Sequence, residues 1–196
     1  MKGVSIFLAE GFEEVEALAT ADILRRGGVD VKLVSITEDS LVKSSHGVNV
    51  KADLTFSEYR QLCSAEGFCE KDFMVFPGGM PGTKNLAACQ ELMSMMNEHY
   101  GAGGSVAAIC AAPGLVLSQL KGIEGKNFTC FDSFEGYLEE KGARFTPKPA
   151  VTDGRIVSGR SAGHAIAFGL HILEIVKDTE TVAAVRHSVM LDTLPE

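Results

Sequence analysis

Cys110 lies in the stretch SVAAICAAPG (105–114), where an apolar run meets a proline three residues after the cysteine. The small alanines on both sides leave room for a sharp strand-to-helix turn, and such a turn exposes a nucleophilic side chain. The start of the following helix favours negative charge, so we expect the pKa of the Cys110 thiol to be lowered. A buried structural cysteine is the alternative interpretation, because free cysteines are among the most buried residues. The pattern around Cys110 alone does not decide between the two.

Glu16 is a second candidate, in the segment GFEEVEALATADIL (11–24). On a helix with about 100° per residue, Ile23 lies within roughly 20° of Glu16, whereas Glu14 lies far around the helix. Glu16 is therefore expected on the core side, where a carboxylate is costly unless it is paired or protonated. A buried carboxyl group could donate a hydrogen bond to a thiolate or act as a general acid or base. A glutamate that extends from the edge of the apolar stripe into water is the alternative.

Gly78 and Gly79 end the segment FMVFPGG (73–79). Glycines allow backbone N–H groups to approach a ligand or an oxyanion without a side chain in the way. Pro-Gly-Gly is also common in turns. The motif gains weight from its position after a strand that is expected to neighbour the strand leading to Cys110.

The elements that must position these residues alternate along the chain. Short apolar runs predict strands, longer segments predict helices, and turn residues predict hairpins. The expected strands are 4–9, 31–36, 73–79 and 105–109, with a short one at 127–131; the expected helices are 13–26, 84–99, 134–143, 163–177 and 180–190; the expected hairpins are 41–54 and 150–159. This alternation predicts a mostly parallel α/β sheet with helices on both faces, which binds ligands at the carboxyl ends of its strands.

Composition narrows the class of protein further. The chain of 196 residues is 45% hydrophobic and carries a net charge of −8, so we expect one domain over residues 1–196 and no nucleic-acid or membrane partner. No signal peptide or apolar run of roughly 18 residues is recognisable, which favours a cytoplasmic protein. The five cysteines and five histidines lack zinc or redox spacing, and no glycine-rich nucleotide motif follows a strand. We therefore expect reduced thiols, no metal and no cofactor.

Four segments together resemble the ThiJ/PfpI superfamily: LAEGFEEVEA (8–17), VFPGG (75–79), AAICAAP (107–113) and GRIVSGRSAGHAIAFGLHILE (154–174). They occur in order over nearly the whole chain. The resemblance is to the branch that contains YajL-like proteins and the Parkinsonism-associated protein deglycase. It implies a flavodoxin-like three-layer sandwich with a mostly parallel sheet and a cysteine nucleophile elbow, usually as a homodimer.

The resemblance also implies roles for individual residues. It places the reactive cysteine at Cys110 and the protonated glutamate that hydrogen-bonds it at Glu16. It assigns the oxyanion site to two backbone N–H groups, those of Gly79 and Ala111. Gly78 directly precedes Gly79 in the same loop.

Two departures from the family pattern affect the expected chemistry. Protease-like members have a histidine directly after the cysteine, where this chain has Ala111, so a peptidase would lack its base. The animal deglycases have a histidine where this chain has Phe131, which cannot transfer protons. His46 is a substitute or a solvent-facing turn residue, and Cys130 is a resolving thiol or a buried bystander.

The resemblance implies a cofactor-free enzyme that acts on α-oxoaldehydes such as methylglyoxal, or on their early glycation adducts with proteins. Thiolate attack by Cys110 would give a hemithioacetal, and Glu16 would transfer the proton between adjacent carbons. A non-enzymatic oxidative-stress sensor or redox-regulated chaperone, in which Cys110 is oxidised, is the alternative. A role in thiamine-precursor metabolism is a weaker one, since no P-loop or thiazole-phosphate site is recognisable.

Overall fold

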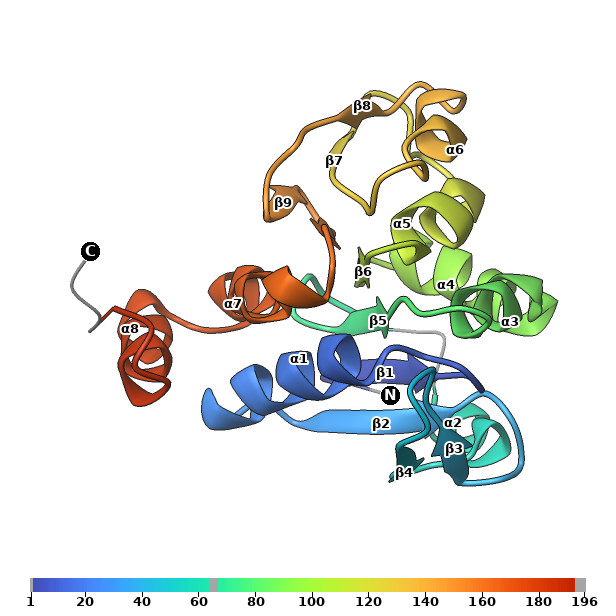
Figure 1. Ribbon diagram of the computed structural model, residues 1–196, viewed down its shortest axis with the longest axis horizontal. Helices are drawn as coiled ribbons and strands as arrows, with labels where there is room; N and C mark the ends of the chain where they lie inside the picture. The colour runs from blue at the N-terminus through green and yellow to red at the C-terminus, as the bar shows by residue number, and fades with distance from the viewer. Residues whose placement is uncertain (1, 64–66, 193–196) are drawn as a thin grey trace.

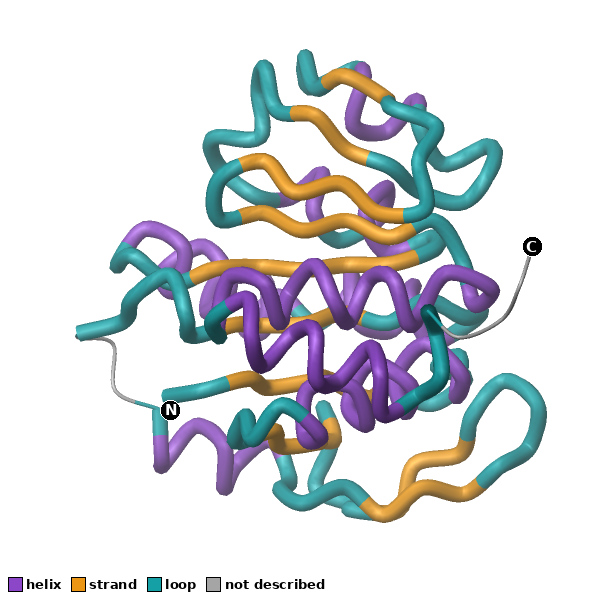
Figure 2. The backbone as a smooth tube through the Cα atoms, turned by 90° about the vertical axis from the view of Figure 1, so that its left-hand side faces the viewer, coloured by secondary structure: helices purple, strands orange, loops and turns teal. Residues whose placement is uncertain are grey.

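A mostly parallel β-sheet crosses the middle of the molecule, with helices packed on both of its faces (Figures 1 and 2). The computed structural model describes residues 2–63 and 67–192. Strand order in the sheet is β2-β1-β5-β6-β10-β9, and only β9 runs antiparallel to its neighbour. The strands are β1 (Val4–Leu8), β2 (Val31–Ser35), β5 (Phe73–Phe76), β6 (Ser105–Ile109), β9 (Ala150–Asp153) and β10 (Ile156–Gly159).

The helices form the two outer layers. One core lies between the sheet and α1 (Glu14–Arg26), α7 (Ala165–Val176) and α8 (Thr179–Ser188). The other core lies between the opposite face and α2 (Phe56–Leu62), α3 (Gly82–Ala88), α4 (Gln90–Gly101) and α5 (Ala112–Leu115). The predicted flavodoxin-like three-layer fold is confirmed.

The central strands are apolar throughout because both faces of the sheet are covered. In β1, Ile6 and Leu8 pack into the core beneath α1, whereas Phe7 between them packs into the opposite core. All five residues of β1 and of β6 are buried. This two-sided burial explains why the sequence shows continuous apolar runs instead of an alternating pattern.

Smaller elements lie around the sheet. The predicted hairpins are confirmed: β3 (Leu41–Lys43) pairs antiparallel with β4 (Asn49–Lys51), and β9 with β10. Beyond β9, β7 (Asn127–Phe128) pairs parallel with β8 (Arg144–Phe145), and the short helix α6 (Gly136–Glu139) lies between them in sequence. Short 3-10 helices occur at Leu117–Gln119 and Ala162–His164. None of the helices in the described ranges combines the length and the apolar character that crossing a membrane requires.

Several boundaries differ from the sequence-based expectation. The expected helix 84–99 is two helices, α3 and α4, which meet at Cys89, where ψ is 89°. On one continuous helix Leu86 and Leu92 would lie about 120° apart; the break lets both pack into the same core.

Two expected elements are shorter in the structure than the sequence predicted, and one helix was not predicted. The expected strand 127–131 pairs only over Asn127–Phe128, and the expected helix 134–143 is limited to α6, followed by Gly142 at φ +82°. The helix α2 was not predicted, although its capping box is visible in sequence, with Thr55 and Glu58 three residues apart.

Replacing Leu173 in α7 by alanine tests the packing of the two helices on this face. Leu173 is fully buried, and its side chain fills the space beside Gly27 at the end of α1. We expect Leu173→Ala to lower the free energy of unfolding by about 2–5 kcal/mol, because it leaves a cavity. Urea denaturation measures the change. The control is Ile166→Ala on the same helix, where the side chain is 40% exposed; an equal loss in both variants would contradict this packing.

Candidate active site

Cys110 occupies a sharp turn between β6 and α5. Its φ of +67° lies in the left-handed region, which is uncommon for a residue with a side chain and costs of the order of 1–3 kcal/mol. The surrounding backbone holds it there: the Cys110 N–H donates to the Gly159 carbonyl over 3.0 Å, and its carbonyl accepts from the Phe131 N–H over 2.8 Å. The backbone therefore has the elbow conformation expected from the sequence.

Glu16 is buried on the core side of α1, as its position on the helix predicted, and is only 1% exposed. Its Oε2 accepts a hydrogen bond of 2.8 Å from the Gly78 N–H. Oε1 is buried and has no hydrogen-bond partner within the described residues. The carboxyl group is thus anchored by one oxygen, and the other remains available to hold a proton.

Gly78 separates Glu16 from Cys110. A Cβ atom at position 78 would lie 2.5 Å from the Cys110 Cβ, 3.0 Å from its Sγ and 2.6 Å from the Glu16 Oε2. No side chain fits in this space. The carboxyl group and the thiol therefore meet across the backbone of a glycine, which brings together three of the residues singled out in the sequence.

The two acidic groups influence each other strongly. Burial raises the pKa of Glu16 to about 7, and the charge of Glu13 adds to the effect, whereas hydrogen bonds from the Gly78 N–H and the Cys110 thiol oppose it. Burial and the neighbouring Glu16 raise the pKa of Cys110 to about 12.

The expected lowering of the thiol pKa is therefore wrong. The helix α5 that follows is a single turn, Ala112–Leu115, so its terminus offers little positive potential. The opposing effect comes from the N–H groups of Ala111 and Gly79, which hydrogen-bond the sulfur of Cys110. At neutral pH the thiol keeps its proton, and Glu16 is the group that titrates.

The predicted backbone donors fall into two roles. The N–H groups of Gly79 and Ala111 interact with the sulfur of Cys110 and lower its pKa. The N–H of Gly78 instead donates to Glu16. Gly79 has φ +91°, a conformation that glycine adopts without strain.

Phe131 and Cys130, two further candidate residues, differ in their relation to Cys110. Phe131 is linked to Cys110 through its backbone N–H, and its side chain is 46% exposed. Cys130 is fully buried in the core that also contains α4 and α5, and burial together with Glu135 raises the pKa of its thiol to about 12. A protonated, buried Cys130 matches the bystander interpretation better than that of a resolving thiol.

His46 lies in the exposed turn of the β3–β4 hairpin and pairs with the start of α1. Its Nδ1 is 3.1 Å from Glu14 Oε1 and 4.0 Å from Glu13 Oε1, and no described contact joins it to Cys110. These three side chains could together hold a metal ion. Exposed acidic groups gather in this way without a metal as well, and Glu13 already has a structural role.

Glu13 is a residue that the sequence reasoning missed. It is the N-cap of α1: its Oε2 accepts the Glu16 N–H over 2.6 Å, and its own N–H donates to the Gly78 carbonyl over 2.9 Å. Glu13 therefore fixes both the first turn that carries Glu16 and the loop that carries Gly78. Its position directly before the apolar helical pattern was the signal that could have revealed it.

Arg160, also missed, follows β10 and forms an ion pair with Asp132, the neighbour of Phe131. Its positive charge lowers the pKa of Cys130, against the larger effects that raise it. Arg160 thus ties the loop after Cys130 to the end of the sheet.

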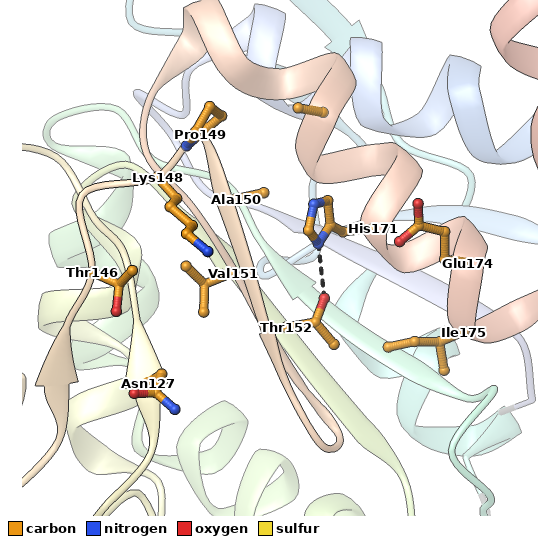
Figure 3. A pocket seen from close by; sticks show the side chains of 11 residues that line it. Asn127, Thr146, Lys148, Pro149, Ala150, Val151, Thr152, His171, Glu174 and Ile175 are labelled. Carbon is orange, nitrogen blue, oxygen red and sulfur yellow. Dashed lines mark hydrogen bonds between the residues drawn. The ribbon is translucent and has the colours of Figure 1, made fainter.

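A groove of about 880 Å³ lies away from this centre, between α7 and the strands β7 to β9 (Figure 3). His171 and Thr152 lie side by side in its wall, with a hydrogen bond of 2.9 Å between Nδ1 and Oγ1. None of the predicted site residues lines it. The volume of this groove therefore does not identify it as the candidate site around Cys110.

The pattern that characterises the DJ-1/PfpI family matches residues 2–175. The chain belongs to this family. It is 30% identical to the glutathione-independent glyoxalase DJ-1 of Schizosaccharomyces pombe, over 97% of this chain and 100% of that protein. A mutant of a DJ-1 superfamily protein from Salmonella typhimurium has a similar structure, with a TM-score of 0.84, 32% identity, and 96% and 98% of the two chains covered.

The chain is also 35% identical to protein DJ-1 homolog A of Arabidopsis thaliana, over 88% of this chain. It spans less than half the length of this plant relative and of homolog B, 42% and 38% respectively.

Gly78→Ala tests the close contact between Glu16 and Cys110. The added methyl group would overlap both side chains, so we expect a loss of about 1–3 kcal/mol in the free energy of unfolding. The control is Gly136→Ala, where a Cβ would meet nothing within 4 Å; we expect that variant to change stability by less than about 0.5 kcal/mol. Urea denaturation of both variants provides the comparison, and indistinguishable midpoints would refute the contact.

The raised pKa of Glu16 makes stability depend on pH. Since the folded protein binds this proton more tightly than the unfolded chain, whose reference pKa is 4.5, the stabilisation that Glu16 contributes is complete below pH 4.5 and is lost as pH rises through about 7. Relative to Glu16→Gln, the wild type should lose about 3 kcal/mol between these limits. Denaturation curves from pH 4.5 to 8.5 measure this difference. Cys110→Ala should retain the dependence, because burial is its main cause; a flat difference would contradict the assignment.

Proposed function

We propose that this protein is a cofactor-free enzyme that converts small α-oxoaldehydes such as methylglyoxal, or their early adducts with proteins, in protection against aldehyde stress. The observation that carries the proposal is a buried carboxyl group, Glu16, with a pKa of about 7 next to the thiol of Cys110. Relatives named glutathione-independent glyoxalase, in Schizosaccharomyces pombe and Caenorhabditis elegans, support it.

The first step uses Glu16 as a general base. Its carboxylate accepts the thiol proton of Cys110 while the sulfur attacks the aldehyde carbon, which gives a hemithioacetal oxyanion. The N–H groups of Gly79 and Ala111, which contact the sulfur, are placed to stabilise this oxyanion. The high pKa of the free thiol is compatible with this step because Cys110 loses its proton only as the new bond forms.

The second step moves a proton between the two carbons of the substrate. The oxyanion is protonated by Glu16, which then removes the proton from the former aldehyde carbon and returns it to the adjacent carbon. The hydroxyl proton passes to the oxygen of that adjacent carbon, and the product is a thioester of the hydroxy acid on Cys110. Water then hydrolyses the thioester to the hydroxy acid, here lactate, and the thiol is regenerated. One carbon is oxidised and its neighbour reduced, so no external oxidant or cofactor is required.

Phe131 limits this mechanism to one proton-transfer group. Its ring has no titratable atom, and no other titratable side chain is described in contact with Cys110. Glu16 must therefore serve every proton transfer, which favours slow turnover.

We also propose a cytoplasmic homodimer, on the basis of the family resemblance. The exposed apolar residues Val15 and Leu18 on the outer side of α1 are consistent with a contact between two copies. Small aldehydes or glycated proteins are the proposed substrates, with no nucleic-acid or membrane partner.

Lactate production from methylglyoxal in the absence of glutathione tests the function. We expect lactate from the wild type and a loss of at least about 100-fold in kcat/KM in Cys110→Ala and in Glu16→Gln, because each removes an essential group. Cys63→Ala is the matched control and should keep full activity, since Cys63 lies on the opposite core.

Lactate no higher than in Cys110→Ala would overturn the enzymatic proposal. The oxidation sensor or redox-regulated chaperone would then be favoured, and mass spectrometry after peroxide treatment would identify sulfinic acid on Cys110. Oxidation confined to other cysteines would exclude that alternative as well.

The variant Phe131→His tests whether the lack of a second proton-transfer group near Cys110 limits turnover. An imidazole beside the Cys110 turn, with an ordinary pKa near 6.5, would supply a second group for proton transfer. We expect kcat for methylglyoxal to rise by about tenfold or more, with a new dependence on pH near neutrality. Phe131→Leu provides the control for the loss of the ring, and equal rates in the two variants would show that proton transfer does not limit turnover.

A further inference from the structure

The Glu16 carboxyl group, which the proposed function uses as its proton carrier, belongs to the first turn of α1. The helix begins at Glu14, so Glu16 is its third residue. The first N–H groups of a helix have no acceptor within the helix, and helix ends fray for this reason. Contacts from outside the helix must therefore hold the Glu16 carboxyl group at a constant distance from the Cys110 thiol.

Three hydrogen bonds form a closed ring around this turn. The Glu16 N–H donates to Glu13 Oε2 over 2.6 Å, and the Glu13 N–H donates to the Gly78 carbonyl over 2.9 Å. The Gly78 N–H in turn donates to Glu16 Oε2 over 2.8 Å. Each of the three residues donates once and accepts once, so the same ring holds both the backbone and the carboxyl group of Glu16.

The Glu13 side chain is the link in this ring that a substitution can remove by itself. Gly78 contributes only backbone groups, and Glu16 is the proton carrier. The backbone of Glu13 is fixed independently of its side chain, because its nitrogen would lie 2.4 Å from a Cβ atom at Gly79 and its N–H is bonded to Gly78. The Glu13 carboxylate extends this fixed point to the N–H of Glu16.

Glutamate is also an unusual choice for the N-cap of a helix. Ser, Thr, Asp and Asn are the preferred N-cap residues, and the helices α2 and α8 follow this rule with Thr55 and Asp178. A shorter side chain would be enough to stabilise α1. The presence of Glu13 at the turn that carries Glu16 indicates a requirement beyond the stability of the helix.

We propose that Glu13 is a positioning residue: its carboxylate fixes the first turn of α1, so that the Glu16 carboxyl group stays within reach of the Cys110 thiol. No described contact joins Glu13 to Cys110, so Glu13 acts through Glu16. This inference rests on the proposed function, in which Glu16 performs the proton transfers. A badly placed proton carrier slows the chemical step and leaves substrate binding intact, so the Glu13 side chain should affect kcat and not KM.

Turnover of methylglyoxal by two variants of Glu13 tests the inference. Glu13→Ala removes the acceptor of the Glu16 N–H. Glu13→Gln keeps an oxygen acceptor at the same distance from the backbone and removes only the charge. We expect kcat to fall about tenfold or more in Glu13→Ala, with KM changed by less than about twofold, since a displacement of about 1 Å can cost about 100-fold in rate. Glu13→Gln should restore kcat to within about twofold of the wild type.

The matched control is Asp178→Ala. Asp178 accepts the Thr181 N–H over 2.8 Å at the start of α8, so this variant also removes the side-chain cap of one helix. We expect both alanine variants to lower the urea midpoint to a similar extent, but only Glu13→Ala to lower kcat. A merely structural role of Glu13 predicts the same kcat in the two variants.

Hydrogen exchange of backbone amides, followed by NMR, supplies a readout that needs no substrate. In Glu13→Ala we expect faster exchange at Glu16, whose N–H loses its acceptor. We also expect faster exchange at Gly78, whose N–H donates to the Glu16 carboxyl group. Glu13→Gln should keep both amides protected, and Asp178→Ala should change neither of them.

Three results would overturn the inference: a kcat in Glu13→Ala no lower than in Asp178→Ala, a loss of kcat in Glu13→Gln as large as in Glu13→Ala, or unchanged exchange at Gly78 in Glu13→Ala. The second result would assign the effect to the charge of Glu13 and not to its hydrogen bond. Absence of lactate from the wild type would refute the proposed function, whereas the exchange at Gly78 would still decide whether Glu13 positions Glu16.

Discussion

The space around Gly78 is the constraint on which the rest of this site depends. Its Cα lies where a side chain would collide with both Glu16 and Cys110, so α1 and the β6–α5 turn can approach each other only across this glycine. Glu13 reinforces the arrangement by bonding to the loop and to the first turn of α1. The sheet fixes the rest, since β5 and β6 are adjacent parallel strands that end at the same edge.

This close approach determines the chemistry of the pair. Burial raises the pKa of both groups, and the charge of Glu16 raises that of Cys110 further, whereas the hydrogen bond from the thiol lowers the pKa of Glu16. Glu16 becomes a base that works near neutral pH, and Cys110 becomes a thiol that needs such a base. An exposed cysteine at a long helix terminus would have behaved in the opposite way, with a permanent thiolate. The sharing of one proton is therefore a property of burial and proximity together.

The carboxyl ends and the amino ends of β5 and β6 differ in the groups that surround them. At the carboxyl ends, the backbone N–H groups of Gly79 and Ala111 interact with the sulfur of Cys110. At the amino ends, His99 joins the carbonyl groups of Asp72 and Ser105 and leaves one ring nitrogen without a partner. Parallel pairing places the carboxyl ends of β5 and β6 at one edge of the sheet and their amino ends at the other.

The sequence by itself predicted most of the strands and helices and placed Glu16 on the core side of its helix, with a solvent-facing glutamate as the alternative, because apolar periodicity and local turn residues are properties of neighbouring positions. The family followed from the resemblance of four motifs. The sequence also located Cys110 and the two glycines in turns. Only the tertiary structure decided the direction of the thiol pKa, the separation of His46 from the reactive cysteine and the division of 84–99 into two helices. Each of these depends on groups that are distant in sequence, and a pattern along one segment carries no information about the charge or the space that another segment brings to it.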